Sequence, residues 1–437
     1  MIRFVAVCAL TLLASLPARA EVAIQEVTSP GGITAWLVEE HSIPFMALEI
    51  RFKGGASLDD PAKRGAINLM TGLIEEGAGD LDARGFAKAR DAMAASYGFD
   101  VHDDALSISA KFLSENRDAA VDLLRLALTE TRFDQDAVDR VRGQVLSGLR
   151  SSAKDPNDIA GAKFDEISFG PHPYGSPLEG TMETVNALTR EDMFDARDRV
   201  IAKDRIFVGA VGDITPDELG VLLDDLLGGL PQTGAPMPTR ADLMLDAGVT
   251  VVPFDTPQSV ALFGHEGITR DDDDFFAAYV LNVILGGGSF EARLMEEVRE
   301  KRGLTYGVYS FLVPKDYGEL YMGQVASAND RVAEAIEVIR AEWARMATDG
   351  VTQDELDRAK TFLTGAYPLR FDGNGPIANI MVGMQMQGLP IDYIATRNAQ
   401  VEAVTLEMAN RVAARILRPD DLHFVVVGQP EGLESTN

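Results

Sequence analysis

The chain has 437 residues, of which 46% are hydrophobic and 25% charged, a globular composition that excludes a disordered chain. A single hydrophobic core rarely serves this length, so two or more domains are expected. The formal net charge of -28 disfavours nucleic acid and anionic lipid as partners, because both carry the same sign of charge.

The first twenty residues have the pattern of a secretory signal peptide. Arg3 precedes the mostly apolar run 4–16, and residues 17–20, Pro-Ala-Arg-Ala, fit the A-x-A cleavage pattern. Cleavage would remove Cys8, the only cysteine, so disulfides, a cysteine nucleophile and cysteine metal ligands are excluded from the mature chain. No later apolar run reaches the roughly 18 residues that a membrane helix needs. We therefore expect a periplasmic protein without a membrane span.

The first half of the mature chain, 21–230, predicts a sheet covered by helices. Asp60 and Pro61 form a good N-cap and first-turn pair for a helix that runs from Ala66 to Leu73. Clustered or alternating apolar residues predict strands over 33–38, 46–52, 105–112 and 205–211. Helical periodicity is expected over 87–97, 119–128, 136–151 and 190–200, and turn residues predict a loop over 170–175.

The second half, 249–437, repeats the order of the first, which indicates an internal duplication. Residues 135–140 (QDAVDR) are matched by residues 353–358 (QDELDR), each at the start of a long helix. Residues 231–248 contain three prolines and predict a linker. We therefore expect an α+β protein of two homologous domains, each a mostly antiparallel sheet covered by helices.

The stretch 285–312 is the strongest candidate for chemistry. Gly286, Gly287 and Gly288 predict a tight backbone turn, because glycine tolerates conformations in which a Cβ would clash. A helix then follows and ends at Gly303, and residues 305–313 predict a buried strand.

Arg299 lies in the last turn of that predicted helix, and Tyr306 lies at the start of the strand. Seven residues across a tight bend could bring a guanidinium and a phenol to one point, where both would donate hydrogen bonds to one oxygen. Taken alone, however, an exposed ion pair between Arg299 and Glu296 and an ordinary strand tyrosine are the simpler explanation.

The duplication, the glycine loop and the Arg–Tyr spacing together resemble the pitrilysin or insulinase family of zinc peptidases, which includes mitochondrial processing peptidase. The likeness covers nearly the whole mature chain and extends to residues 170–192. It implies a pitrilysin-like metallopeptidase fold, and it implies that residues 286–288 let a substrate backbone approach closely. A plain turn between a strand and a helix explains these glycines equally well.

The zinc motif of the family is degenerate in this chain. Catalytic members carry H-x-x-E-H on the helix after the second strand, where two histidines hold zinc and the glutamate activates water. The matching positions hold Asn68, Thr71 and Gly72, and the acids expected on a later helix are replaced by Ser147 and Gly148. We therefore expect that this chain binds no metal or other cofactor.

The resemblance implies that two chains divide the chemistry. A paralogous H-x-x-E-H subunit would bind zinc, and this chain would contribute Arg299 and Tyr306 in trans. It would then be the substrate-binding, transition-state-stabilising subunit of a heterodimeric zinc endopeptidase that acts on peptides or unfolded proteins. The alternative is a non-catalytic assembly or peptide-binding module of the same fold.

Overall fold

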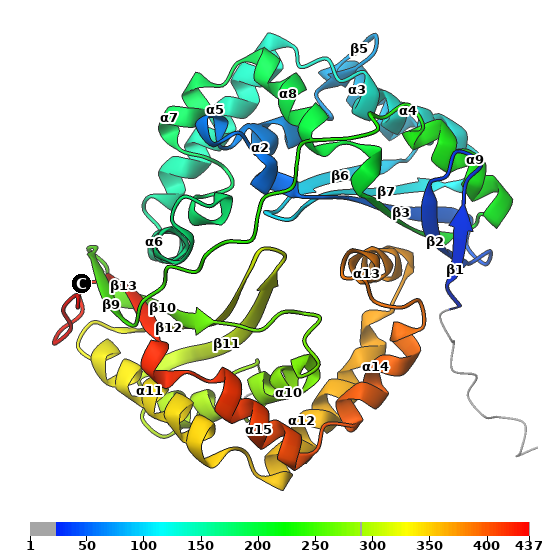
Figure 1. Cartoon of the computed structure of the whole chain (residues 1–437). Coiled ribbons are helices and arrows are strands. Elements are labelled where there is room, and N and C mark those ends of the chain that lie inside the picture. Colours follow the sequence, from blue (N-terminus) through cyan, green and yellow to red (C-terminus); the bar gives the residue numbers. More distant parts are fainter. Residues whose placement is uncertain (1–22, 289–290, 437) are drawn as a thin grey trace, which may run out of the picture.

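The computed structural model describes residues 23–288 and 291–436, which form two lobes, one above the other in Figure 1. Each lobe has its own sheet and its own large apolar core. The predicted signal peptide, 1–20, lies outside the described residues. Within the described ranges, every helix is too short or too polar to cross a membrane.

The first lobe is built on a six-stranded sheet with the strand order β1-β2-β8-β3-β7-β6. The β2–β8 pair is parallel, and the other pairs are antiparallel. The strands are β1 (Gln25–Thr28), β2 (Thr34–Glu39), β3 (Phe45–Lys53), β6 (Ser96–Val101), β7 (Ala105–Leu113) and β8 (Ile206–Gly212). A separate small hairpin consists of β4 (Gly77–Ala78) and β5 (Leu81–Asp82).

Eight α-helices belong to the described part of this half of the chain. They are α2 (Ala66–Thr71), α3 (Ala83–Ala92), α4 (Arg117–Thr129), α5 (Gln135–Ser152), α6 (Pro156–Phe169), α7 (Met182–Ala187), α8 (Arg190–Val200) and α9 (Pro216–Leu227). The predicted helix over 87–97 is wrong at its end, because Ala94 has a positive φ and the chain turns there into β6. The sequence analysis predicts neither β6 nor α6.

The second lobe repeats this plan with a five-stranded sheet of order β11-β12-β10-β13-β9. The β9–β13 pair is parallel and the others are antiparallel. The strands are β9 (Gly248–Pro253), β10 (Gln258–Glu266), β11 (Thr305–Lys315), β12 (Gly318–Ala328) and β13 (His423–Gly428). The predicted fold class, two mostly antiparallel sheets covered by helices, is confirmed.

The described part of the second half contains six α-helices and one π-helix, and all of them except α13 contribute side chains to its apolar core. They are α10 (Phe275–Leu285), the π-helix η6 (Met295–Glu300), α11 (Val332–Asp349), α12 (Gln353–Ala366), α13 (Asn374–Met386), α14 (Tyr393–Glu402) and α15 (Leu406–Ile416). Short 3₁₀ turns in the chain are η1 (Gly55–Leu58), η2 (Pro61–Lys63), η3 (Ser114–Asn116), η4 (Pro173–Gly175), η5 (Lys203–Arg205), η7 (Tyr367–Arg370) and η8 (Pro419–Asp421).

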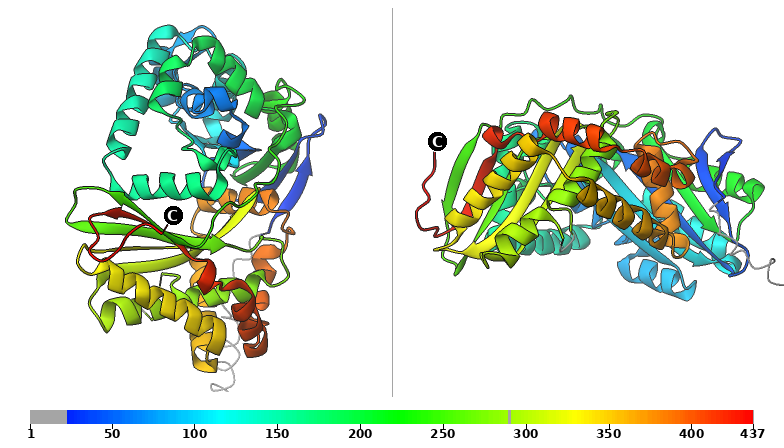
Figure 2. Two further views of the ribbon diagram at one scale, coloured as in Figure 1. Left: turned by 60° about the vertical axis from the view of Figure 1, so that its left-hand side comes forward. Right: turned by 90° about the horizontal axis from the view of Figure 1, so that it is seen from below.

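Two helices lie between the lobes and pack on the sheet of the opposite half. Helix α6 contacts β10 and β13 of the second sheet, and α13 contacts β8 and β3 of the first sheet. Figure 1 shows α6 and α13 at opposite sides of the space between the lobes, and the left view of Figure 2 shows α6 along the second sheet. Both sheets are therefore covered partly on their second face as well, which the sequence does not reveal.

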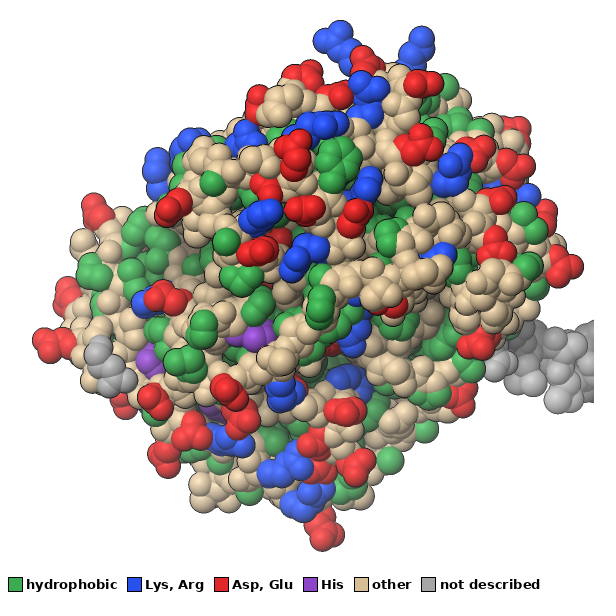
Figure 3. All heavy atoms as spheres, turned by 45° about the horizontal axis from the view of Figure 1, so that its top comes forward, with side chains coloured by type: hydrophobic (Ala, Val, Ile, Leu, Met, Phe, Trp, Pro, Cys, Tyr) green, Lys and Arg blue, Asp and Glu red, His purple; other side chains and the backbone are tan. Residues whose placement is uncertain are grey.

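The negative charge of the chain is distributed over its surface. Figure 3 shows acidic and basic side chains interspersed on one face. Many of these carboxylates pair with nearby arginines, as Asp354 does with Arg358 and Glu76 with Arg140. Such exposed pairs contribute little to stability, so their main effect is on solubility and on the choice of partners.

Candidate functional site

The helix that carries Arg299 has π geometry. The N–H group of Lys301 donates to the carbonyl of Glu296, five residues earlier, at 2.9 Å. The π-helix ends at Glu300, and the turn after it closes at Gly303, whose φ of 63° is left-handed, as the sequence predicts. Wide π turns are rare and occur frequently at functional sites, where they displace a side chain from its ordinary helical position.

A β-bulge follows at once and contains Tyr306. The register of β11 against β12 shifts between Thr305 and Val308, so Tyr306 and Gly307 together lie opposite the single residue Ala326. The Thr305 hydroxyl donates to the carbonyl of Ala326 at 2.6 Å, and the Gly307 N–H donates to that hydroxyl at 3.0 Å. The bulge turns Tyr306 outward, and this residue is 87% exposed.

The strand predicted over 305–313 is present as β11, but the prediction that it is buried is wrong. Strand β11 is the edge strand of the second sheet, and its side chains alternate between the core and the opposite face. Val308 and Ser310 are buried, whereas Tyr309 and Phe311 are partly exposed. The clustered aromatic residues predict burial of both faces of the strand. In the structure only one face of this edge strand packs on the core, and Tyr309 and Phe311 lie on the other.

Arg299 shares this corner of the lobe with Tyr306, because η6 packs against β11. Its Nε atom lies 3.2 Å from Glu300 Oε1, and its side chain is 34% exposed. The predicted partner Glu296 instead pairs with Lys301 at 2.9 Å. The structure therefore places the two predicted residues on adjoining, irregular elements, and the convergence of their side chains on one ligand stays a prediction.

The three glycines follow helix α10 and precede the segment that leads to η6, so the alternative of a turn after a strand is wrong. The Gly286 carbonyl accepts a hydrogen bond from the Ser310 N–H of β11 at 3.0 Å. A Cβ on Gly286 would lie 2.6 Å from the Ser310 hydroxyl, and one on Gly287 would lie 2.8 Å from the Val283 Cα. Gly288 has a φ of 89°. Close packing of the chain on itself thus requires two of these glycines, and their contact with substrate stays a prediction.

The degenerate zinc motif lies on α2, a helix of six residues. Its N-terminus is held by Asp59, whose carboxylate accepts hydrogen bonds from the N–H groups of Gly65 and Ile67 at 2.8 and 2.9 Å. Burial raises the pKa of Asp59 to about 6, although these two hydrogen bonds act in the opposite direction. The predicted cap, Asp60, belongs to the preceding 3₁₀ turn η2 and accepts from Ala62.

The residues at the motif positions do not fit a zinc ion. The hydroxyl of Thr71 donates to the Ile67 carbonyl at 2.8 Å, within its own helix. Gly72 has no side chain, and a Cβ there would lie 3.1 Å from Val141 of α5. Ser147 and Gly148, further along α5, are exposed. An amide, a bonded hydroxyl and a bare backbone provide none of the imidazole or carboxylate ligands that zinc prefers.

Comparison with known proteins supports the family resemblance. The family model described as peptidase M16 inactive domain matches residues 187–363. The non-peptidase homolog YmxG of Helicobacter pylori is 28% identical over 393 residues, which covers 89% of this chain and 90% of that protein. A crystal structure of a peptidase M16 inactive domain from Pseudomonas fluorescens has a TM-score of 0.87 and 26% identity, and it covers 94% of this chain and 100% of that one.

The chain is a homologue of the pitrilysin-like M16 peptidases. Other M16 relatives, such as an uncharacterized zinc protease of Mycobacterium leprae at 28% identity over 397 residues, bear the names of proteases. With Asn68, Thr71 and Gly72 at the motif positions, this chain is an M16 homologue of the inactive kind. Across residues 23–288 and 291–436, no three His, Cys, Asp or Glu side chains form a group that could hold a metal.

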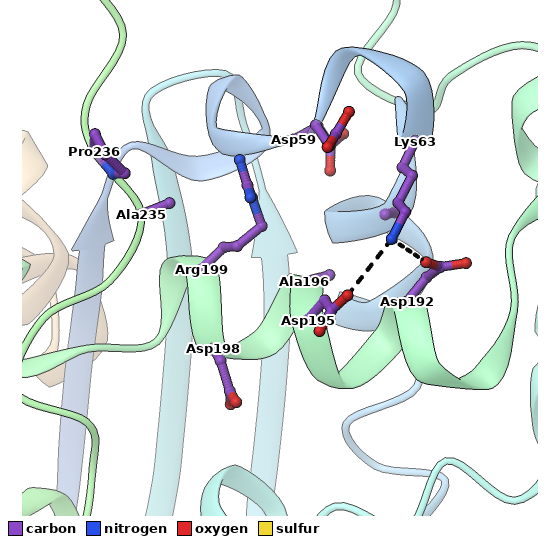
Figure 4. A pocket seen from close by; sticks show the side chains of 11 residues that line it. Asp59, Lys63, Asp192, Asp195, Ala196, Asp198, Arg199, Ala235 and Pro236 are labelled. Carbon is purple, nitrogen blue, oxygen red and sulfur yellow. Dashed lines mark hydrogen bonds and ion pairs between the residues drawn. The ribbon is translucent and has the colours of Figure 1, made fainter.

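A cavity of about 450 Å³ lies beside the degenerate motif of this M16 chain, between the turn η2, helix α8 and the linker. Figure 4 shows the Lys63 ammonium between Asp192 and Asp195, at 2.5 and 3.5 Å. Arg199 donates to the backbone carbonyl of Leu58 at 2.6 Å. Lys63 is thus paired with two carboxylates, and Arg199 is bonded to the backbone. We therefore interpret these charged side chains of the cavity wall as contacts that hold the first lobe together.

The two irregularities that present Arg299 and Tyr306, the π turn and the β-bulge, are not predicted from the sequence. Thr305 and Gly307 hold the bulge, and the T-x-G pattern around the tyrosine is the signal that points to them. The π geometry of η6 has no comparable signature in the sequence, because it depends on how this segment fits against β11.

Proposed function

We propose that this M16 homologue is the non-zinc-binding subunit of a heteromeric zinc endopeptidase. In this proposal it acts in the periplasm, and its substrates are peptides or unfolded proteins. The observation that carries the proposal is the corner formed by η6 and β11, which presents Tyr306 to the outside and places Arg299 on the adjoining helix.

The chemistry of the two side chains suits the stabilisation of an oxyanion. When a peptide carbonyl is attacked, negative charge develops on its oxygen, and donors fixed beforehand lower the energy of that transition state. A guanidinium provides two parallel N–H donors and a phenol provides one O–H donor. Because the Tyr306 side chain is exposed, a group on another chain can reach it.

The metal and the attacking water belong to the partner in this proposal. The residues at the motif positions on α2 do not fit zinc, so a paralogous subunit with an intact H-x-x-E-H motif is required. The names of this chain's relatives, which include both a non-peptidase homolog and zinc proteases, are consistent with a division of this kind.

A reconstituted mixture tests the proposal. The purified chain is combined with the H-x-x-E-H paralogue from the same genome, and cleavage of an unstructured peptide is measured. We expect Arg299→Ala and Tyr306→Phe each to lower kcat by about 10²- to 10³-fold, the usual cost of removing an oxyanion donor.

Matched controls are available on the same two elements. Arg302→Ala removes a cation that pairs with Glu297 in the same turn, and Tyr309→Phe removes the next exposed phenol of β11. Both controls are expected to keep kcat within about twofold, in the range of surface substitutions. If the Arg299 and Tyr306 variants also keep full activity, the catalytic role is wrong. A stable complex that cleaves nothing would instead support the assembly module.

A further inference from the structure

The tip of the β11–β12 hairpin is attached to the first lobe by a polar junction. Its residues are Lys315, Asp316 and Tyr317, which connect the two longest strands of the second sheet. The Lys315 ammonium lies 2.7 Å from Asp103 Oδ2, and the Asp316 carboxylate lies 3.0 Å from the ammonium of Lys53. On the first lobe, Lys53 belongs to β3, and Asp103 lies in the turn between β6 and β7.

Tyr174 is the centre of the same junction. Its hydroxyl donates to Asp104 and accepts a hydrogen bond from the Tyr317 N–H at 3.2 Å. Asp104 also accepts from the Asp316 N–H at 3.2 Å, and burial raises the pKa of Asp104. The Lys315 ammonium lies 4.4 Å from the centre of the Tyr174 ring. The junction is thus a connected network around the buried Tyr174, whose hydrogen bonds are strengthened by its removal from water, while Lys53 and Asp316 at its margin are partly exposed.

Two apolar contacts also hold the lobes together. Phe164 and Phe169 of α6, from the first half, are buried among residues of the second sheet that include Leu320 and Val425. At the opposite side, α13 of the second half buries side chains against the first sheet, where Met381 and Met384 belong to one cluster with Trp36 and Val211. The α6 contact adjoins the junction, because the Phe169 and Tyr174 rings lie 5.3 Å apart between centroids, whereas α13 is a separate attachment. Rotation about either attached side is therefore opposed by the other.

The strand that ends in the junction is the one that begins at the proposed site. Strand β11 runs from Thr305 to Lys315, and β12 pairs with it along this length apart from the bulge. At about 3.3 Å per residue, its two ends are about 35 Å apart. A paired strand transmits a displacement of one end to the other, because its hydrogen bonds fix the direction of the backbone.

We propose that the junction of Asp103, Asp104 and Tyr174 with the hairpin tip holds the two lobes in one fixed arrangement and thereby positions Tyr306 relative to the first lobe. The inference rests on the proposed function for its catalytic consequence. A peptide then enters by movement between this chain and its partner, and the two lobes of this chain do not open.

A distance measurement tests the fixed arrangement without reference to catalysis. Because Cys8 is the only cysteine and precedes the predicted cleavage site, spin labels can be attached to Asp118→Cys on α4 and Glu334→Cys on α11 of the mature chain. We expect one narrow distance distribution, unchanged when the partner and an unstructured peptide are added. A second distance, or a shift on addition of partner and peptide, overturns the proposal.

Substitutions at the junction test the positioning role. Tyr174→Phe removes the hydroxyl that joins Asp104 to the Tyr317 backbone, and we expect it to broaden the distance distribution and to lower kcat of the mixture about 10-fold or more, with little change in KM. Tyr317→Phe is the matched control, because Tyr317 contributes its backbone N–H and carbonyl to the contacts. It is expected to leave both measurements unchanged.

The outcomes separate this inference from the proposed function. An inactive wild-type mixture contradicts the proposed function, and the distance distribution alone then decides whether the lobes are fixed. An active mixture in which Tyr174→Phe changes neither the distances nor kcat overturns the inference. Lys315→Arg keeps the charge at the tip and is expected to retain activity, whereas Lys315→Met is expected to lose it in part.

Discussion

His265 shows how burial sets the protonation state of a single side chain in this protein. It is almost fully buried on β10, where its Nε2 atom accepts a hydrogen bond from the Trp343 indole at 2.9 Å. Its Nδ1–H therefore donates to the carbonyl of Glu266, at 2.7 Å. Burial lowers the pKa of His265 to about 4. The neutral ring thus joins α11 to the sheet through two hydrogen bonds.

This depressed pKa predicts a loss of stability in acid. The unfolded chain takes up the His265 proton near its ordinary pKa of 6.5, and the folded chain does so only near 4. The free energy of unfolding therefore keeps this contribution above pH 6.5 and loses up to about 3 kcal/mol of it as the pH falls to 4. Urea unfolding at pH 7 and pH 4.5 measures the difference, which His265→Gln should reduce.

His41 is the matched control for this prediction. It is exposed, and hydrogen bonds with Asp213 and Glu39 raise its pKa above 6.5. The sign of its contribution is therefore opposite: it is present below pH 6.5 and is lost as the pH rises through the folded pKa. The variant His41→Gln should keep the acid sensitivity of the wild type. If His265→Gln has the same pH profile as the wild type, the assignment to His265 is wrong.

At the scale of one element, helix α2 depends on a single capping residue. Asp59 accepts from two first-turn N–H groups and lies 3.5 Å from the guanidinium of Arg64. Asp59→Ala should lower the free energy of unfolding by about 2 kcal/mol, because it leaves two buried N–H groups and a buried cation without this acceptor. Asp60→Ala, which affects only a 3₁₀ turn, should cost less than half as much in the same urea titration. Equal losses would contradict the assignment of the cap to Asp59.

Asp59 also shows why some elements can be predicted from the sequence and others cannot. Two adjacent aspartates precede Pro61, and local rules favour Asp60, because proline prefers the position after a cap. The positive φ of Gly65 moves the true start of the helix beyond both. By contrast, Asp155 and Pro156 carry the same signal at the start of α6, where it is correct, so this missed helix was predictable.

The candidate site shows the same limit. The spacing of Arg299 and Tyr306 and the turn at Gly303 follow from local preferences, and the structure agrees with them in placing both residues on adjoining elements. The π turn and the bulge depend on contacts between η6, β11 and β12. Rules that use only neighbouring residues in the sequence cannot predict such contacts. The wrong prediction that β11 is buried has the same cause. The position of this strand at the sheet edge is a property of the whole lobe, and its own residues do not reveal it.

At the scale of the whole molecule, the duplicated halves are two lobes with separate sheets, yet neither half covers its sheet alone. Helix α6 continues from the first half and buries Phe164 against the second sheet. Helix α13 continues from the second half and buries Met381 against the first. Each half therefore covers part of the other half's sheet with one of its helices. A half on its own would expose both that helix and the uncovered sheet face to water, so each half should be unstable when separated.

This exchange predicts how the chain responds to being cut. A protease site inserted between Gln232 and Thr233, in the exposed part of the linker, should leave the two fragments associated after cleavage, because α6, α13 and the hairpin junction still connect them. Size-exclusion chromatography of the cut protein should show one peak at the size of the intact chain. Residues 23–230 and 249–436 expressed separately should each aggregate and should recover this peak when expressed together. If each half alone is a stable, soluble monomer, α6 and α13 are not required by the sheets they cover, and the lobes are held together by the junction alone.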